Sequence, residues 1–376
     1  MEYLYAFLGS VIPFLIVLTI IVFVHELGHY LVARWNGIAV ETFSIGFGPE
    51  LAGFNDKNGT RWKISAIPLG GYVKFLGDMN AASVPDFEHQ QATIDPKTRS
   101  EMFQFKNVWQ RISVVMAGPV ANIIFTFVIL YGLLVGLGRY SLEATIDDVE
   151  VGSPAEISGL MADDRVLAVD GYNVRSFSDF QRLIATSPDA DVVVRVERAG
   201  MPLDVAVRTG EVERTDQFGN TTKIGYLGVV REATQEDVIF VRPGPIEAVF
   251  ITFEEMVLIV DRSFEFLGRI FVGKDDVDQL GGPVKIAKIS GEAASIGIFT
   301  LVSLMALLSL NIGIFNLLPI PMLDGGHLVY YIFEVVRGKP LSQKAQEIGF
   351  RFGLIFVLSL MVFVTTNDVV STWFSN

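Results

Sequence analysis

The chain has 376 residues, of which 51% are hydrophobic, and its mean hydropathy of +0.44 is too high for an ordinary soluble protein. It contains no cysteine, which excludes disulfide bonds and thiolate metal sites, so a zinc ion could be held only by His, Asp or Glu. A net charge of −13 without a basic patch argues against nucleic-acid partners.

Four segments are apolar and long enough to cross a bilayer, which takes about 20 residues. Basic residues orient them: residues 34–111 contain nine Lys and Arg and residues 319–351 contain four, whereas residues 1–10 and the tail from 369 contain none. By the positive-inside rule, both termini lie outside. We therefore expect a multi-pass membrane protein whose termini lie outside. Because residues 1–10 contain no Lys or Arg, as a cleaved secretory signal would, we also expect the first helix to be retained. The predicted spans are about 6–31, 112–137, 299–318 and 351–368.

The first span ends in the sequence His25-Glu26-Leu27-Gly28-His29. On a helix, residues four apart share a face, so His25 and His29 can bind one metal ion with Glu26 beside it as a general base. Ionisable residues in a membrane helix are costly and usually functional. The alternative is that this motif is an ordinary surface helix, which the apolar residues before it disfavour.

Residues 37–77 have the pattern of strands, because Trp62, Ile64 and Ala66 alternate with polar residues. We expect a small β-sheet on the cytoplasmic side that dips towards the metal site, although plain turns in a linking segment explain the glycines equally well. In the segment that follows, His89 has no neighbour at ligand spacing and is expected to be a solvated loop residue. Asn122, which follows Gly118-Pro119 in the second span, either packs against another helix or takes part in the site.

A soluble segment follows the second span. Within residues 143–210 strands alternate with one turn-rich loop and a helix from about Ser178. The stretch SPAEISGLMADDRVLAVDG is similar to the signature of bacterial PDZ domains, which add a peptide strand to a sheet edge. Asp163 replaces the usual glycine of that signature, and Asp tolerates left-handed backbone angles better than most residues.

Residues 245–272 are apolar enough to suggest a fifth span. However, charged residues recur at intervals of seven or four and mark one polar face, namely Glu247, Glu254, Asp261, Glu265 and Arg269. This pattern is typical of a helix that lies in the membrane interface. A fifth span would also move residues 319–327 to the opposite side of the membrane from His25.

The third span carries the candidate for the missing ligand, since a catalytic zinc site takes three protein ligands. Prolines at 319 and 321 interrupt the helix, and such a break is tolerated only in a protein-lined or wet environment. Asp324 follows the break on the side of His25 and is the predicted ligand, whereas its alternative role is to cap the next helix. His327 is a competing ligand. Asn316 could bind an unwound substrate or an oxyanion, or only pack between helices.

Several motifs occur together in order: HELGH, FSIGFGP, PLGGYVKF, GPVAN, GGPVKIAKISG and NLLPIPMLDGGH. With one PDZ-like segment, the chain resembles the site-2 protease family of intramembrane zinc metalloproteases, of the bacterial regulator-of-sigma-E type. The resemblance implies zinc ligands at His25, His29 and Asp324 and a catalytic Glu26. It also implies a substrate-positioning Asn316 and a membrane-reentrant sheet at roughly 40–76.

The expected fold is thus a polytopic α-helical membrane protein with four transmembrane helices, a small membrane-associated β-sheet and one external PDZ-like α/β domain. The expected function is regulated intramembrane proteolysis: a single-span protein, such as an anti-sigma factor or a signal-peptide remnant, is cut in its membrane segment after a first external cut. The segments are 1–34 (first helix with HExxH), 35–108 (sheet and loop), 109–138 (second helix), 139–212 (PDZ-like), 213–297 (linker and interfacial helix), 298–335 (third helix, broken at LDG) and 336–376 (fourth helix and tail).

Two other functions are compatible with parts of the sequence. A non-catalytic membrane scaffold could use the PDZ-like domain to bind peptide tails around a structural zinc ion. A metal transporter could use His25, His29 and Asp324 as a transit site. Glu26 distinguishes the three functions, because only the protease needs this carboxylate for its chemistry.

Overall fold

The computed structural model describes residues 2–77, 94–215, 221–231, 238–271 and 281–374. The described chain divides into two compact units: unit 1 is formed by residues 1–132 and 249–376, and unit 2 by residues 133–248. Because His89 and the segment around it fall outside the described residues, the prediction for that histidine is not tested.

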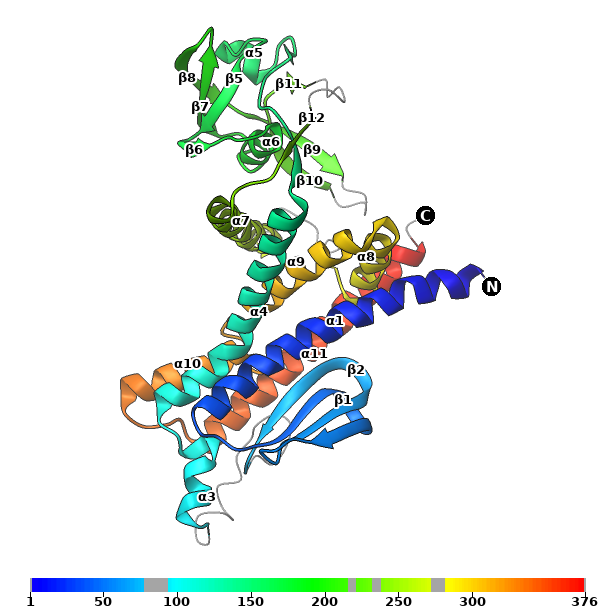
Figure 1. Cartoon of the computed structure of the whole chain (residues 1–376), viewed down its shortest axis with the longest axis vertical. Coiled ribbons are helices and arrows are strands. Elements are labelled where there is room, and N and C mark those ends of the chain that lie inside the picture. The colour runs from blue at the N-terminus through cyan, green and yellow to red at the C-terminus, as the bar shows by residue number, and fades with distance from the viewer. Residues whose placement is uncertain (1, 78–93, 216–220, 232–237, 272–280, 375–376) are drawn as a thin grey trace. The chain divides into compact units, whose positions relative to one another are not determined.

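Unit 1 is mainly helical and contains one β-hairpin (Figure 1). Four of its helices are long and apolar enough to cross a membrane, as the sequence predicts, and they cover Leu8–Trp35, Val108–Leu137, Ile298–Asn316 and Lys344–Thr366. The elements are α1 (Glu2–Trp35), β1 (Val40–Asn55), β2 (Arg61–Phe75), α3 (Pro96–Glu101), η1 (Phe103–Phe105), α4 (Val108–Leu137), α7 (Pro245–Phe271), α8 (Pro283–Ile296), α9 (Ile298–Asn316), α10 (Asp324–Arg337) and α11 (Gln343–Phe374).

The helix predicted for residues 245–272 is present as α7, and it is not among the four candidate spans. Its place in the membrane interface stays a prediction. No helix is predicted for residues 283–296, where the structure has α8. Gly291 of α8 approaches the backbone of Gly9 and Ser10 in α1, so this short helix packs directly on the first span.

The strands β1 and β2 form the small sheet expected after the first span. Residues 42–45 of β1 have Cα partners in two parts of β2, at 71–74 and at 61–64, so the hairpin folds back on itself. Phe43, which is almost completely buried, stacks on Trp62 with ring centroids 4.2 Å apart. Together with Tyr30 of α1 and their neighbours, these rings form the apolar core that attaches the sheet to the end of α1 (Figure 1).

The turn between β1 and β2 is attached to α1 by a single carboxylate. Asp56 accepts hydrogen bonds from the hydroxyl of Tyr30 at 2.8 Å, the indole of Trp62 at 3.1 Å, and the amides of Asn58 and Thr60 at 2.8 and 2.9 Å. Partial burial opposes ionisation of Asp56, but these donors stabilise its charged form and lower its pKa to about 2. The hairpin is therefore held at its tip as well as at its base.

Unit 2 is a mixed α/β unit built around a four-stranded antiparallel sheet in the order β6-β5-β7-β8. Along β7, alternate side chains at Val192, Val194 and Val196 are buried, as expected for a strand with one covered face. The elements are β3 (Arg139–Leu142), β4 (Asp148–Val149), α5 (Pro154–Ser158), β5 (Arg165–Val169), β6 (Tyr172–Asn173), α6 (Phe177–Ala185), β7 (Asp191–Arg198), β8 (Met201–Arg208), β9 (Gly210–Thr215), β10 (Thr221–Tyr226), β11 (Val229–Val230) and β12 (Val238–Val241).

Unit 2 is longer than the PDZ-like segment expected at 139–212. The reason is that β11 pairs with β4 and β12 pairs with β3, which joins residues up to 241 to the beginning of the unit. The turn at Asp163 has a φ of +65°, which confirms that Asp takes the left-handed conformation where the signature has glycine. The order of strands, loop and helix from 143 to 210 also agrees with the prediction.

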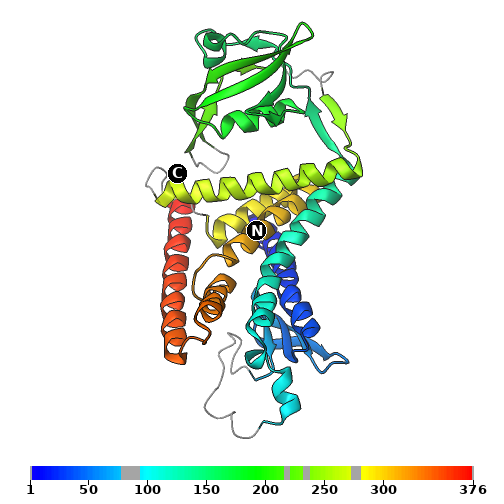
Figure 2. The same ribbon diagram turned by 90° about the vertical axis from the view of Figure 1, so that its left-hand side faces the viewer.

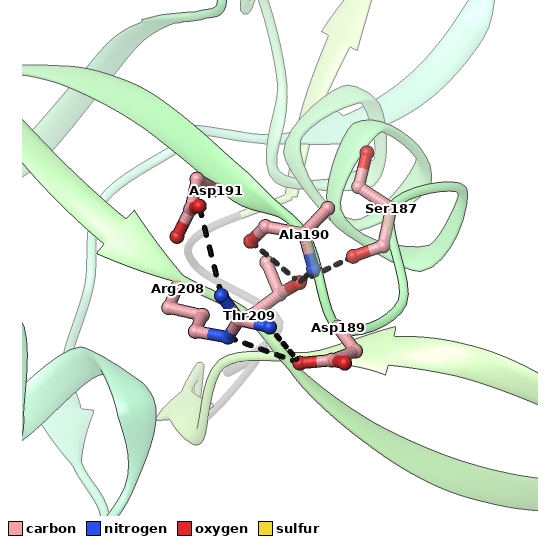
Figure 3. A network of polar contacts seen from close by, with 6 residues as sticks. All are labelled: Ser187, Asp189, Ala190, Asp191, Arg208 and Thr209. Atoms are coloured by element: carbon pink, nitrogen blue, oxygen red, sulfur yellow. Dashed lines mark hydrogen bonds and ion pairs between the residues drawn. The ribbon is translucent and has the colours of Figure 1, made fainter.

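A polar network joins α6 to the beginning of β7 and the end of β8 (Figure 3). The hydroxyl of Thr209, which is 2% exposed, accepts a hydrogen bond from the amide of Ala190 at 2.9 Å and donates to the carbonyl of Ser187. On the surface of the same network, the guanidinium of Arg208 contacts the carboxylate of Asp189 at 2.9 Å. Buried and exposed polar contacts thus lie side by side in unit 2.

Candidate metal centre

The helix α1 supplies the first half of a candidate metal centre. Its last turns carry His25, Glu26 and His29, and the two imidazoles meet edge to face with ring centroids 4.9 Å apart. Their Nε2 atoms are 3.2 Å apart. The i, i+4 spacing thus brings both nitrogens to one point, as the sequence predicts.

The second half comes from the break between α9 and α10. The helix α9 ends at Asn316, a turn with Pro319 and Pro321 follows, and α10 begins at Asp324. Within the turn Met322 has a φ of +84°, a strained angle for a residue with a side chain. Asp324 is the first residue of α10, the N-cap position is taken by Leu323, and no side-chain capping hydrogen bond is present, so the alternative role of Asp324 as a helix cap is not seen.

Two glycines make this tight turn possible. A Cβ atom at Gly325 would lie 2.0 Å from the carbonyl oxygen of Leu318, and one at Gly326 would lie 2.5 Å from that of Ile320. Real Cβ atoms do not approach oxygen so closely. The pair therefore allows α10 to start directly under the turn, which brings the Asp324 carboxylate to the histidines.

The three predicted ligands meet in the structure. The Nε2 atom of His25 lies 3.1 Å from Asp324 Oδ2, and that of His29 lies 3.5 Å from Asp324 Oδ1. In the described part of the chain these residues form a group whose donor atoms lie within 4.8 Å of one another. Zinc bonds of about 2.0–2.1 Å at tetrahedral angles put neighbouring ligand atoms about 3.3 Å apart, so the site has the dimensions that zinc needs.

The position of the hydrogen on the neutral His29 ring also favours a cation at the centre of these ligands. Its Nδ1 atom is 2.8 Å from the carbonyl oxygen of Val114 in α4, and since a carbonyl can only accept, Nδ1 carries the hydrogen. In the neutral ring Nε2 then presents a lone pair. Asp324 Oδ2 is buried and accepts no hydrogen bond from the described residues. Lone pairs that converge without a donor are costly in a buried site, and a metal ion removes that cost.

The helix α4 closes the site from the other side. A Cβ atom at Gly118 would lie 2.3 Å from His29 Nε2 and 2.8 Å from His25 Nε2, so the backbone of α4 runs against both ligand atoms. A Cβ atom at Gly28 of α1 would likewise lie 2.3 Å from the carbonyl oxygen of Ala117. The two helices therefore pack closely at this point, and in Figure 1 they converge towards the end of α1 that leads into the hairpin. Figure 2 shows the same two helices turned by 90°.

A cavity of about 390 Å³ opens beside the ligands. Glu26 and Asn316 face it, as does the competing candidate His327, whose nitrogens do not join the group of three ligand atoms. The wall opposite α10 comes from the hairpin, through Phe47, Gly71, Tyr72, Val73 and Phe75. A Cβ atom at Gly71 would lie 3.1 Å from Glu26 Cγ, so the strand β2 passes directly over the carboxylate that the sequence proposes as the base.

The structure thus brings together every residue for which the sequence predicts a role in the site. It adds two that the sequence does not predict, Val114 and Gly118 of α4. Val114 contributes only its backbone carbonyl, which leaves no trace in the sequence. Gly118 lies in the GPVAN motif, whose residue pattern gives no sign of a contact with the ligands. Asn122 of the same motif lies 3.3 Å from His25.

Known proteins match nearly the whole chain. Residues 13–360 match Peptidase family M50. A protein of Brucella suis, named as a zinc metalloprotease, is 46% identical over 361 residues, which cover 96% of this chain and 95% of that protein. One of Agrobacterium fabrum with the same kind of name is 44% identical over 364 residues, or 96% of both chains. The metalloprotease MmpA of Caulobacter vibrioides is 38% identical over 384 residues, again 96% of both.

Proposed function

Because the chain belongs to Peptidase family M50 and is a zinc metalloprotease with four apolar helices, we propose that it hydrolyses peptide bonds in the membrane segments of other proteins. The observation that carries this proposal is the position of the ligands. His25 and His29 lie within the candidate span Leu8–Trp35, and Asp324 reaches them through a break that follows another span. A site built from spanning helices is suited to a substrate that arrives through the bilayer.

The residues of the site divide the chemistry between them. His25, His29 and Asp324 would hold the zinc ion, which supplies a Lewis acid for the scissile carbonyl. Glu26 faces the same cavity and would take the proton of the attacking water and return it to the leaving amine. Asn316, at the end of α9, offers an amide that can bind the substrate backbone or the developing oxyanion.

A substrate helix must unwind before it can be cut, because its carbonyls are hydrogen-bonded within the helix. The β-hairpin provides a surface for the unwound segment. Its residues 71–73 line the cavity beside Glu26, and an extended peptide could add to the sheet as a further strand. The exposed apolar side chains of Phe47, Phe54 and Leu69 suit a hairpin that dips into the membrane.

We further propose the cellular setting that the sequence suggests. The substrates are single-span proteins, such as anti-sigma factors or signal-peptide remnants, that another protease has already trimmed outside the membrane. The protein lies in the bacterial inner membrane, with periplasmic termini and its site near the cytoplasmic side. The charge distribution and the bacterial origin of the relatives support this setting. A non-catalytic scaffold is not favoured, because a scaffold has no need of Glu26.

Glu26→Gln in the full chain tests the proposal. Purified protein in proteoliposomes would be given a single-span reporter with a short external part, and the products would be identified by mass spectrometry. The amide keeps the size of the side chain but cannot take a proton, so cleavage should fall about 10²–10⁴-fold while bound zinc is unchanged. Glu292→Gln in α8 is the matched control and should cleave normally.

Two results would contradict the proposal. One is cleavage by the Glu26→Gln variant at the rate of the original protein. The other is a product cut only outside the membrane segment of the reporter. A second reporter with a large folded external domain tests the order of the two cuts, and equal cleavage of both reporters would exclude a requirement for prior trimming.

A further inference from the structure

Asn122 is buried beside the candidate metal centre in a way that helix packing alone does not explain. It lies in α4 with 0% of its surface exposed, and its amide nitrogen is 3.3 Å from Nδ1 of His25. Its amide oxygen is buried too and has no hydrogen-bond partner among the described residues. An unpaired buried polar atom costs about 1–3 kcal/mol, so its presence next to a ligand needs a reason.

The chemistry of His25 supplies the reason. For Nε2 to give a lone pair to zinc, the hydrogen of the neutral ring must be on Nδ1. A ring N–H cannot accept a hydrogen bond from an amide NH₂. The contact between the amide nitrogen of Asn122 and Nδ1 of His25 therefore suits only the tautomer with its hydrogen on Nε2, which cannot bind zinc through that atom. Turning the amide of Asn122 by 180° exchanges its oxygen and nitrogen without changing its shape. The unpaired oxygen then accepts from Nδ1–H.

We propose that Asn122 is a positioning residue for the metal ligand His25: its amide oxygen accepts the hydrogen of Nδ1 and directs the Nε2 lone pair at the zinc ion. The helix α4 would then orient both histidines in the same manner, since the carbonyl of Val114 already accepts from Nδ1 of His29. The inference rests on the zinc site and not on where the enzyme cuts its substrates.

The surroundings hold Asn122 in place for this role. Its backbone carbonyl accepts hydrogen bonds from the hydroxyls of Thr126 at 3.0 Å and of Ser309 in α9 at 3.1 Å. On its other side, a Cβ atom at Gly313 would lie 3.2 Å from Asn122 Cβ, so the α9 backbone leaves little room for the side chain to swing away. These backbone contacts would survive a change of the side chain, which makes the amide testable by itself.

The test compares Asn122→Leu with Asn122→Asp in the full, detergent-solubilised chain. Leu has the same branched shape, with larger end groups, but no acceptor, whereas Asp presents an oxygen in either orientation. Zinc affinity is measured by competition with a chromophoric chelator. Loss of the outer partner of a ligand typically weakens metal binding about 10–100-fold, so we expect that loss in the Leu variant and near-normal affinity in the Asp variant. The visible spectrum of Co²⁺ in the site should change in the Leu variant only.

Stability without metal separates positioning from packing. Without zinc, the Leu variant should still fold and melt cooperatively, because the backbone contacts of residue 122 to Thr126 and Ser309 remain, so a loss of zinc affinity is not a loss of the fold. Asn311→Leu is the matched control: Asn311 of α9 accepts from the hydroxyl of Ser263 at 2.8 Å, so its loss should lower stability and leave zinc affinity unchanged. Normal zinc affinity in the Asn122→Leu variant, or equal losses in the Leu and Asp variants, would overturn the proposal.

Discussion

Gly118 is the position where the smallest change should have the largest effect on metal binding. It lies in α4, and a methyl group there would be 2.3 Å from His29 Nε2 and 2.8 Å from His25 Nε2. Ordinary non-bonded contacts begin at about 3.5 Å, so Gly118→Ala requires His29 or the α4 backbone to move by about 1.2 Å. The ligand atoms lie 3.1–3.5 Å apart, and a shift of that size removes one of them from the site.

The expected loss follows from this displacement. Binding sites tolerate errors of only about 0.5 Å in ligand position, and displacing the reacting groups by about 1 Å can cost about 100-fold in rate. We therefore expect Gly118→Ala to lower zinc affinity at least about 10-fold and cleavage about 100-fold. Zinc affinity is measured first, by chelator competition in detergent, because that measurement needs no substrate.

Gly132→Ala is the control for this prediction. It adds the same methyl group to the same helix, at a position with nothing within 4 Å of the new atom. Both changes give the helix the same gain in propensity, so the difference between them isolates the contact with the histidines. A Gly118→Ala variant that binds zinc within twofold of the original protein would refute the packing of α4 against the ligands, as would an equal loss in Gly132→Ala.

Two further predictions concern stability. In unit 2, Thr209→Val should lower the free energy of unfolding by about 1–3 kcal/mol, because it removes a buried hydroxyl and leaves the partly buried Ala190 amide without its acceptor (Figure 3). Arg208→Ala should change it little, because the carboxylate partners of Arg208 are exposed. Hydrogen exchange of β7 in the full chain measures both variants, and equal effects would contradict this ranking. In unit 1, the pKa of Asp56 is lowered from 3.8 to about 2, so its contribution to folding is complete above pH 4 and is lost as the pH falls towards 2. The protection factor of the Thr60 amide, which is corrected for the pH dependence of intrinsic exchange, should therefore fall over that range in the original protein, and Asp56→Asn should remove most of this fall.

The sequence was sufficient to predict the helical parts of the site, because their signals are local. The spacing of His25 and His29 follows from helix geometry, and the four apolar segments are long enough to be recognised one by one. Prolines and glycines marked the break before Asp324 for the same reason. The choice of Asp324 over His327 as the third ligand rests on the family resemblance, and in the described residues the donor atoms of Asp324, not those of His327, lie in one group with those of the two histidines.

Other features could not be predicted because their causes are not local. The helix α8 begins at Pro283 after two glycines, and a tertiary contact holds its start: Asp368 of α11 accepts hydrogen bonds from the amides of Gly282 and Lys285. The doubled pairing of β1 depends on contacts between residues that lie far apart in the hairpin. Every residue has a backbone carbonyl like that of Val114, so no pattern of side chains in the sequence shows which carbonyl contacts His29.

The helix α4 restricts the orientation of the two histidine ligands. The i, i+4 spacing of the two histidines on α1 determines neither the tautomer nor the rotation of their rings. The closeness of Gly118 limits rotation, and the Val114 carbonyl fixes the tautomer of His29. A helix can pass this close to two imidazoles only where it lacks a side chain, so the glycine and the ligands require each other. The metal centre is therefore a property of three packed segments, of which the histidine motif is only the part visible in the sequence.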